Sequence, residues 1–268
     1  MNHHSEVTII DIFRKKNLNL LVSYIFLELN RCYATLFFMK NSIPCIYCHH
    51  PLYQLTDGMV KCSVCKKKYS PMRVDQIKSL IQLFCHDENA LATSKTLNLS
   101  YVTTLKYYQK FRHLAAEYCE AQYETFRTQE SQYEEYLYLE KSKRRDKTAI
   151  FDSHNFLTFG YGNYVYTLLM PSLGMFKQQF VEDNLEEVYS KEFSKFMRTS
   201  KIIKISEHDN AITKFWHYFE QFITSFKGVS NDHFPYYLKE AEFKFNTPPS
   251  ERSKILEQLY FRPNGSDT

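Results

Sequence analysis

Two cysteine pairs with the same spacing carry the clearest chemistry in this sequence. Cys45 and Cys48 form the first pair, and Cys62 and Cys65 form the second. Each Cys-x-x-Cys turn presents two thiolates from one short loop, and Zn²⁺ accepts four such ligands in a tetrahedron. Because four thiolates complete the coordination shell, the expected zinc site is structural. Four unrelated buried cysteines, or two disulfides, are the alternatives, and disulfides need an oxidising compartment.

The segment between the two pairs predicts how the cysteines are positioned. Residues 51–61 contain Asp57-Gly58, a turn signal, and are expected to form a small β-hairpin. A hairpin flanked by two cysteine turns is the organisation of a zinc ribbon, which we expect over residues 41–70. The seven cysteines of the chain, an odd number, favour a reducing compartment.

Composition narrows the class of protein. The chain has 268 residues, of which 44% are hydrophobic and 24% charged, as is typical of soluble globular proteins. It contains no G-x-x-x-x-G-K or G-x-G-x-x-G segment, which argues against P-loop NTPases and Rossmann enzymes. The apolar stretch 17–39 includes Glu28 and Arg31, so an amphipathic helix is expected there and not a membrane span. The sequence shows no typical signal-peptide cleavage site, and we expect a cytoplasmic protein.

Helical signals follow the ribbon. A short helix through Leu97, a tight turn at 98–100 and a longer helix from Tyr101 to about Tyr118 match the helix-turn-helix layout, whose second helix reads DNA. A generic helical hairpin is the alternative. Residues 119–131 are polar and are expected to be a linker or a helix end. Phosphate contacts are expected from six basic residues, although charge runs are often only solvated faces: Lys66, Lys67, Lys68, Lys106, Lys110 and Arg112.

The second half of the chain mixes strand and helix signals. Three strands are expected, at 133–139, 155–159 and 164–170. After them the pattern predicts four helices and one short strand: helices at 186–196, 211–226, 233–245 and 250–259, and a strand at 202–205. This order of elements predicts an α/β or α+β fold.

Two blocks near the C-terminus resemble a known family. The segment from His208 to Trp216, and the segment from Tyr237 to Asn246, are similar to the C-terminal part of the ISXO-type transposases of bacterial insertion sequences. The family signature runs H-x-N-x-I-x-x-F-W, then a G-V segment, then Y-L-x-E-x-x-[FW]-[KR]-[FY]-N. The resemblance covers about residues 45–247, including the ribbon, and it is most specific in the C-terminal block.

The resemblance implies a DDE-type transposase with an RNase H-like catalytic domain, a mixed sheet with flanking helices. Such enzymes hold two Mg²⁺ or Mn²⁺ ions on acidic residues and cut and join DNA strands. Their partners are terminal inverted repeats and target DNA, bound by a homodimer that associates with the nucleoid. The implied organisation is an N-terminal helical segment at 1–40, a zinc ribbon at 41–70, a helix-turn-helix region at 71–125, a catalytic domain at 131–247 and a tail at 248–268.

Carried over residue by residue, the resemblance places Glu134, Asp183 and Asn210 at the three catalytic positions. Glu134 and Asp183 would hold the catalytic Mg²⁺. The chain departs from the pattern at Glu134, where the family has the shorter Asp, and at Thr213, where many relatives have Glu. It could therefore be a working variant, or a decayed copy that retains only zinc-dependent DNA binding. A zinc-ribbon transcription factor is a further alternative, but it leaves the mixed second half unexplained.

Ordinary structural roles are also available to these residues. Glu134 and Glu135 are adjacent in an expected strand, so only one of them can face a metal ion. Asp183 could cap the helix that follows it, and Asn210 could cap the helix that begins at Ala211.

Overall fold

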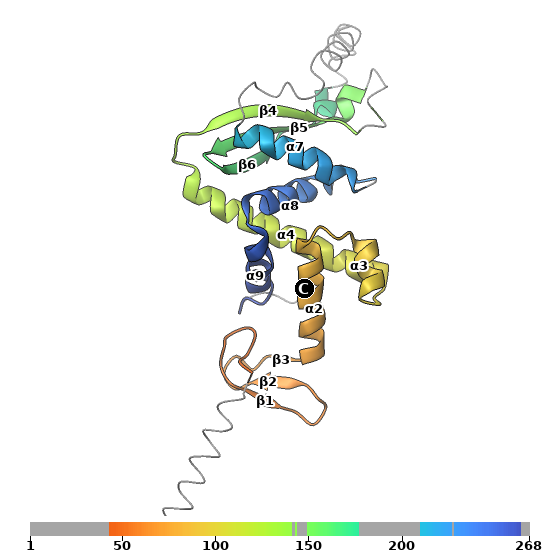
Figure 1. Cartoon of the computed structure of the whole chain (residues 1–268), viewed down its shortest axis with the longest axis vertical. Helices are drawn as coiled ribbons and strands as arrows, with labels where there is room; N and C mark the ends of the chain where they lie inside the picture. The colour runs from red at the N-terminus through yellow and green to blue at the C-terminus, as the bar shows by residue number, and fades with distance from the viewer. Residues whose placement is uncertain (1–42, 141–142, 144–148, 177–209, 227, 264–268) are drawn as a thin grey trace, which may run out of the picture. The chain divides into compact units, whose positions relative to one another are not determined.

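The computed structural model describes residues 43–140, 143, 149–176, 210–226 and 228–263 (Figure 1). The chain divides into two compact units, Met1–Arg73 and Val74–Thr268. Helices and two small antiparallel sheets make the fold α+β, as the sequence predicted. Several predicted features lie outside the described residues: the helix within 1–40, the helix at 186–196, the strand at 202–205, Asp183 and His208.

The described part of the first unit is a three-stranded antiparallel sheet. Strands β1 (Leu52–Gln54), β2 (Val60–Cys62) and β3 (Lys68–Tyr69) pair in that order. The predicted hairpin is confirmed, because β1 and β2 pair on either side of a turn at Asp57-Gly58. Gly58 has a φ of +74°, a left-handed conformation that glycine adopts without strain.

Three helices follow the ribbon: α2 (Pro71–Cys85), α3 (Ala90–Thr96) and α4 (Tyr101–Phe126). The short helix, tight turn and longer helix of the prediction are confirmed. Ser100 caps α4 by accepting a hydrogen bond from the Thr103 amide at 3.1 Å. A buried hydrogen bond of 2.7 Å between Thr93 of α3 and Tyr108 of α4 fixes the two helices against each other.

Helix α4 is longer than the sequence predicted, because it continues to Phe126 through most of the expected linker. Its last turns pack on the second sheet. Tyr123 stacks on Tyr166 with ring centroids 3.8 Å apart, and Phe126 stacks on Tyr164 at 4.6 Å. These tertiary contacts keep a locally polar segment helical, which propensity alone does not reveal.

The second sheet contains the three predicted strands. Strands β4 (Gln132–Tyr138), β5 (His154–Tyr161) and β6 (Tyr164–Leu169) are antiparallel and pair in that order. A short 3₁₀ turn, η1 (Ala149–Asp152), precedes β5, and a second, η2 (Leu173–Phe176), follows β6. The RNase H-like assignment, which concerns more of the chain than these strands, stays a prediction.

Helix α7 (Ala211–Thr224) covers one face of this sheet (Figure 1). Trp216 of α7 stacks on Tyr136 of β4 with centroids 4.0 Å apart and planes 6° from parallel. Phe156, Phe215 and Phe219 are fully buried beside this pair and form the centre of the core. The apolar stripe of α7 is thus the reason that the helix lies on the sheet.

Helix α8 (Phe234–Asn246) binds the free edge of β6 through its side chains. The Asn246 amide accepts a hydrogen bond from Val165 N at 3.0 Å and donates one to Val165 O at 2.7 Å. Two residues along the strand, Thr167 N donates to Glu242 Oε2 at 2.9 Å. These side chains pair with the strand edge as another strand would, and they leave it unavailable for aggregation.

A buried cluster of charged side chains joins α4 to α8. Arg112 Nε lies 2.6 Å from Glu240 Oε2, and Lys244 Nζ lies 2.8 Å from Glu240 Oε1. Lys244 also contacts Asp87, just after α2, at 2.9 Å. Helix α9 (Pro249–Tyr260), predicted at 250–259, packs against α4. Helices α3 and α4 therefore share one compact unit with the second sheet, and the finer domain boundaries stay predictions.

Candidate functional site

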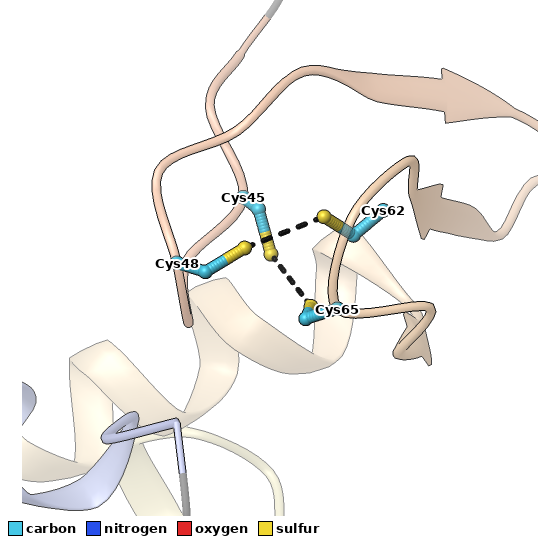
Figure 2. A group of neighbouring side chains, drawn as sticks. All are labelled: Cys45, Cys48, Cys62 and Cys65. Atoms are coloured by element: carbon cyan, nitrogen blue, oxygen red, sulfur yellow. Dashed lines mark hydrogen bonds between the residues drawn. The ribbon is translucent and has the colours of Figure 1, made fainter.

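The four cysteines of the two pairs converge on one point (Figure 2). Their Sγ atoms all lie within 4.8 Å of one another. Cys45 Sγ is 3.7 Å from Cys65 Sγ, and Cys48 Sγ is 3.4 Å from Cys62 Sγ. A tetrahedral Zn²⁺ with bonds of about 2.3 Å separates its sulfur ligands by about 3.8 Å. The cysteines are free thiols and not disulfides, and their geometry fits a zinc ion.

Equivalent backbone turns position the two pairs. His49 follows the first pair and Lys66 follows the second, and both have left-handed backbones with φ of 60° and 62°. Cys45 N donates to His50 O at 2.9 Å, which closes the first turn. Cys62 N donates to Lys67 O at 3.0 Å, which closes the second. The repeated geometry aims both thiol pairs at a common centre.

Two thiols of the cluster differ strongly in acidity. Desolvation raises the pKa of the Cys62 thiol, but hydrogen bonds from the backbone amides of Val64 and Cys65 outweigh it and lower the pKa to about 6. Desolvation raises the pKa of Cys65 to about 12. A metal ion removes this asymmetry, because a coordinating thiol is deprotonated outright. The donor set therefore fits a divalent, thiophilic ion.

The three ribbon lysines have different surroundings. Lys66 is exposed and donates to Ser63 O. Lys67 Nζ lies 4.0 Å from the centre of the Tyr47 ring, a cation–π contact. Lys68 pairs with Asp57 at 2.7 Å, with both side chains about half exposed. Because exposed ion pairs are weak, all three lysines remain able to contact an anionic partner.

The basic residues expected on α4 divide into two groups. Lys106 is exposed, and Lys110 is half-buried with its Nζ 4.7 Å from the Tyr260 ring centre. Arg112 is 3% exposed and forms the buried ion pair with Glu240. The structure therefore removes Arg112 from the expected phosphate contacts. The side chain points into the core, on the same face of α4 as Tyr108 and Phe111.

Glu134, the first expected catalytic residue, lies on the face of the second sheet that α7 covers. Glu134 is two residues before Tyr136, whose ring stacks on α7, so Glu134 projects to the same side. Its strand partner is Thr158, which is fully buried. Glu135 is exposed on the opposite face. Among the described residues, Glu134 forms no hydrogen bond or ion pair, so its carboxylate is available to a ligand.

Asn210 has a clear structural role. Its side-chain Oδ1 accepts a hydrogen bond from Thr213 N at 2.9 Å, and the backbone N–H of Asn210 donates to Thr213 Oγ1 at 3.3 Å, which completes a capping box for α7. The alternative interpretation of Asn210 as a helix cap is therefore confirmed. Thr213, at which the chain departs from the family pattern, is the partner in this box.

The fold brings the start of β4 and the N-terminus of α7 to the same end of the sheet. Gln132, Gly160, Asn210 and Ile212 line one cavity of about 440 Å³. A Cβ on Gly160 would lie 3.1 Å from the Ile212 side chain, so glycine permits this close approach. Glu134 follows two residues after Gln132 on β4. Asn210 thus lies at the same cavity as Gln132, while Glu134 is not among the lining residues and Asp183 lies outside the described residues.

Two exposed apolar side chains at the start of α4 were not predicted from the sequence. Tyr101 is 49% exposed and Val102 is 61% exposed. A signal existed, because Val102 is out of phase with the buried residues Thr104, Tyr108 and Phe111.

Comparison with known proteins shows a similarity to a transposase-like protein. The chain is similar to an uncharacterized transposase-like protein of Haemophilus influenzae, with 34% identity over 71 residues. The matched segment is 25% of this chain and 58% of that protein, so the chain spans little more than half of the relative's length. No family model matches the chain. No solved structure matches it. Among the described residues, no helix has the length and hydropathy needed to cross a membrane.

Proposed function

We propose that this protein is an insertion-sequence transposase that binds the terminal inverted repeats of its element and cleaves and transfers DNA strands. The similarity to a transposase-like protein carries the proposal. The cysteine cluster supports it, because a zinc-stabilised ribbon followed along the chain by a helix-turn-helix suits the binding of duplex DNA. We place the protein in the cytoplasm, acting as a homodimer on its DNA.

The zinc ion would be held by Cys45, Cys48, Cys62 and Cys65, and would stabilise the ribbon. Lys66, Lys67, Lys68, Lys106 and Lys110 would contact phosphates. Affinity should then fall with salt, by about 0.9 log units for each contacted phosphate per tenfold increase in salt concentration. A protein whose DNA affinity is insensitive to salt would contradict this assignment.

Catalysis would use hard oxygen ligands on the covered face of the second sheet. Glu134 offers a carboxylate without a partner among the described residues, and Asp183 is the second ligand that the family resemblance implies. Asn210 uses one oxygen lone pair for its cap and retains another. When bound, Mg²⁺ or Mn²⁺ supplies Lewis-acid activation of a phosphodiester. Glu134 and Asp183 would hold that ion, and Asn210 would be the third catalytic residue.

A nicking and strand-transfer assay tests this function. The substrate is DNA that carries the ends of the protein's own element, with Mg²⁺ or Mn²⁺ present. We expect cleavage by the wild type and its loss in Asp183→Ala, with DNA binding retained. A cleaving Asp183→Ala variant would contradict the assigned metal site.

A second candidate function is DNA binding alone, by a catalytically decayed transposase. Two observations favour it: Glu stands at the first catalytic position, and the side chain of Asn210 is engaged in a helix cap with Thr213. This candidate predicts zinc-dependent DNA binding by the wild type, no cleavage, and a gain of cleavage in Glu134→Asp. Cleavage by the wild type would exclude it.

A further inference from the structure

The outward face of α4 combines apolar and cationic side chains. Val102 and Lys106 are one helical turn apart and both are exposed. They lie opposite the buried residues Thr104 and Tyr108. Tyr101, at the first position of the helix, adds a half-exposed ring. We name Tyr101, Val102 and Lys106 the α4 surface.

Charge is segregated along the part of the sequence that carries this surface. Residues 90–116, which include α3 and the N-terminal half of α4, contain no Asp or Glu. The exposed cations Lys95 and Lys106 lie within this stretch. Acidic residues return only in the second half of α4, beginning at Glu117. A helix surface with apolar side chains, on a stretch that carries cations and no acidic residues, is complementary to a polyanion that also offers apolar groups.

Duplex DNA has this chemistry in its major groove. The groove is about 12 Å wide and admits one α-helix, and each thymine presents a C5-methyl group between the phosphate backbones. The N-terminal residues of a helix-turn-helix recognition helix are the ones that reach base edges. A protein partner would provide the apolar contact, but it would not account for the absence of acidic residues over 90–116.

We propose that the α4 surface reads thymine methyl groups in the major groove, with Val102 as the main contact, Tyr101 as a second contact and Lys106 on an adjacent phosphate. The proposal rests on the DNA binding proposed above, and it adds the base chemistry that is recognised. Sequence preference then comes from apolar side chains of α4, whereas the ribbon lysines contribute affinity that is independent of sequence.

The test is a cycle in which one methyl group is removed from the DNA and the contacting methyl groups are removed from the protein. The full-length, zinc-loaded protein first selects its preferred sequence from duplexes with a randomised segment of about two helical turns. Its affinity is then measured for the selected duplex and for the same duplex with uracil in place of thymine. Uracil lacks only the C5-methyl group, so base pairing and charge are unchanged.

We expect the wild type to bind the uracil duplex about fourfold more weakly for each methyl contact, the equivalent of about 0.8 kcal/mol for one buried methyl group. Val102→Ala should bind the thymine duplex more weakly and should lose most of this discrimination. Alanine is a stronger helix former than valine, so α4 is expected to remain folded. Met175→Ala, at an apolar residue of the 3₁₀ turn η2 that is 72% exposed, is the matched control and should discriminate as the wild type does.

The outcomes separate this inference from the proposed function. Equal affinity of the wild type for thymine and uracil duplexes would overturn the inference and leave DNA binding in place. Discrimination that persists fully in Val102→Ala would also overturn it. Binding to neither duplex would overturn both proposals. A Val102→Ala variant with changed self-association and unchanged DNA affinity would identify the α4 surface as a protein interface instead.

Discussion

Replacing Arg112 distinguishes a core residue from a DNA contact. Arg112→Met removes the charge and keeps most of the apolar stem, so Glu240 loses one of its two cationic partners. Removing one partner of a buried pair typically costs 3–5 kcal/mol. Because Lys244 remains 2.8 Å from Glu240, we expect a loss near the lower limit, about 3 kcal/mol.

Urea unfolding followed by tryptophan fluorescence measures this loss directly. The single tryptophan of the chain, Trp216, is 2% exposed in the core of the same unit, so it reports unfolding of that unit. In the Arg112→Met, Glu240→Leu double variant, the carboxylate is removed as well. The double variant should therefore lose less stability than the sum of the two single variants.

The matched control is Lys106→Met on the opposite, exposed face of α4. It should change stability by less than about 0.5 kcal/mol and should weaken DNA binding instead. A stability loss below about 1 kcal/mol in Arg112→Met would refute the assignment of Arg112 to the core. So would a reduced salt dependence of DNA binding in a fully stable Arg112→Met protein.

Three further predictions concern the zinc ligands, His154 and Asn246. The protein should contain one zinc ion per chain by elemental analysis. Cys62→Ser or a chelator should remove this ion without altering the urea unfolding of the second unit, which Trp216 reports. An unchanged zinc content in Cys62→Ser would contradict a zinc site at the four cysteines. Burial, and secondarily Lys143, lowers the pKa of His154 to about 4, so the folded state favours its neutral form. Stability is then fully present above about pH 6.5 and falls between about pH 6.5 and 4, by about 1–2 kcal/mol after allowing for partial exposure, and His154→Phe should abolish this part of the pH dependence of unfolding. Asn246→Ala leaves the Val165 amide and carbonyl without their side-chain partner, and should cost about 2–3 kcal/mol in urea unfolding; a loss below about 0.5 kcal/mol would contradict the role given to Asn246.

Local patterns were sufficient to predict the ribbon and most of the helices and strands. The cysteine spacing and the Asp57-Gly58 turn define the ribbon, because both are constraints within a few residues. Ser100 at the start of α4 and Asn210 at the start of α7 are capping residues whose role follows from their chemistry.

Features that depend on distant partners could not be predicted in this way. Arg112 is in phase with the buried face of α4, but its partner Glu240 is 128 residues away in sequence. The hydrogen bonds of Glu242 and Asn246 to the edge of β6 also need the tertiary fold. These contacts give the block at 237–246, which the sequence marked only through the family resemblance, a physical role in closing the sheet.

The candidate catalytic site was predictable only through the family resemblance. The sequence could not decide which of Glu134 and Glu135 faces the core, because strand alternation allows either. Packing of Tyr136 on Trp216 decides it in favour of Glu134. No local pattern places Asn210 beside the start of β4, since the two are joined by the packing of α7.

Metal-dependent cleavage by two neighbouring variants tests the central claim most directly. Glu134→Ala and Glu135→Ala each remove one glutamate carboxylate, and the two carboxylates lie on opposite faces of β4. Each variant is assayed on element-end DNA with Mn²⁺. The account predicts that Glu134→Ala abolishes strand cleavage while Glu135→Ala cleaves as the wild type does, with DNA affinity similar in both. Equal cleavage by the two variants, from a cleaving wild type, would contradict a metal site on the covered face of the sheet.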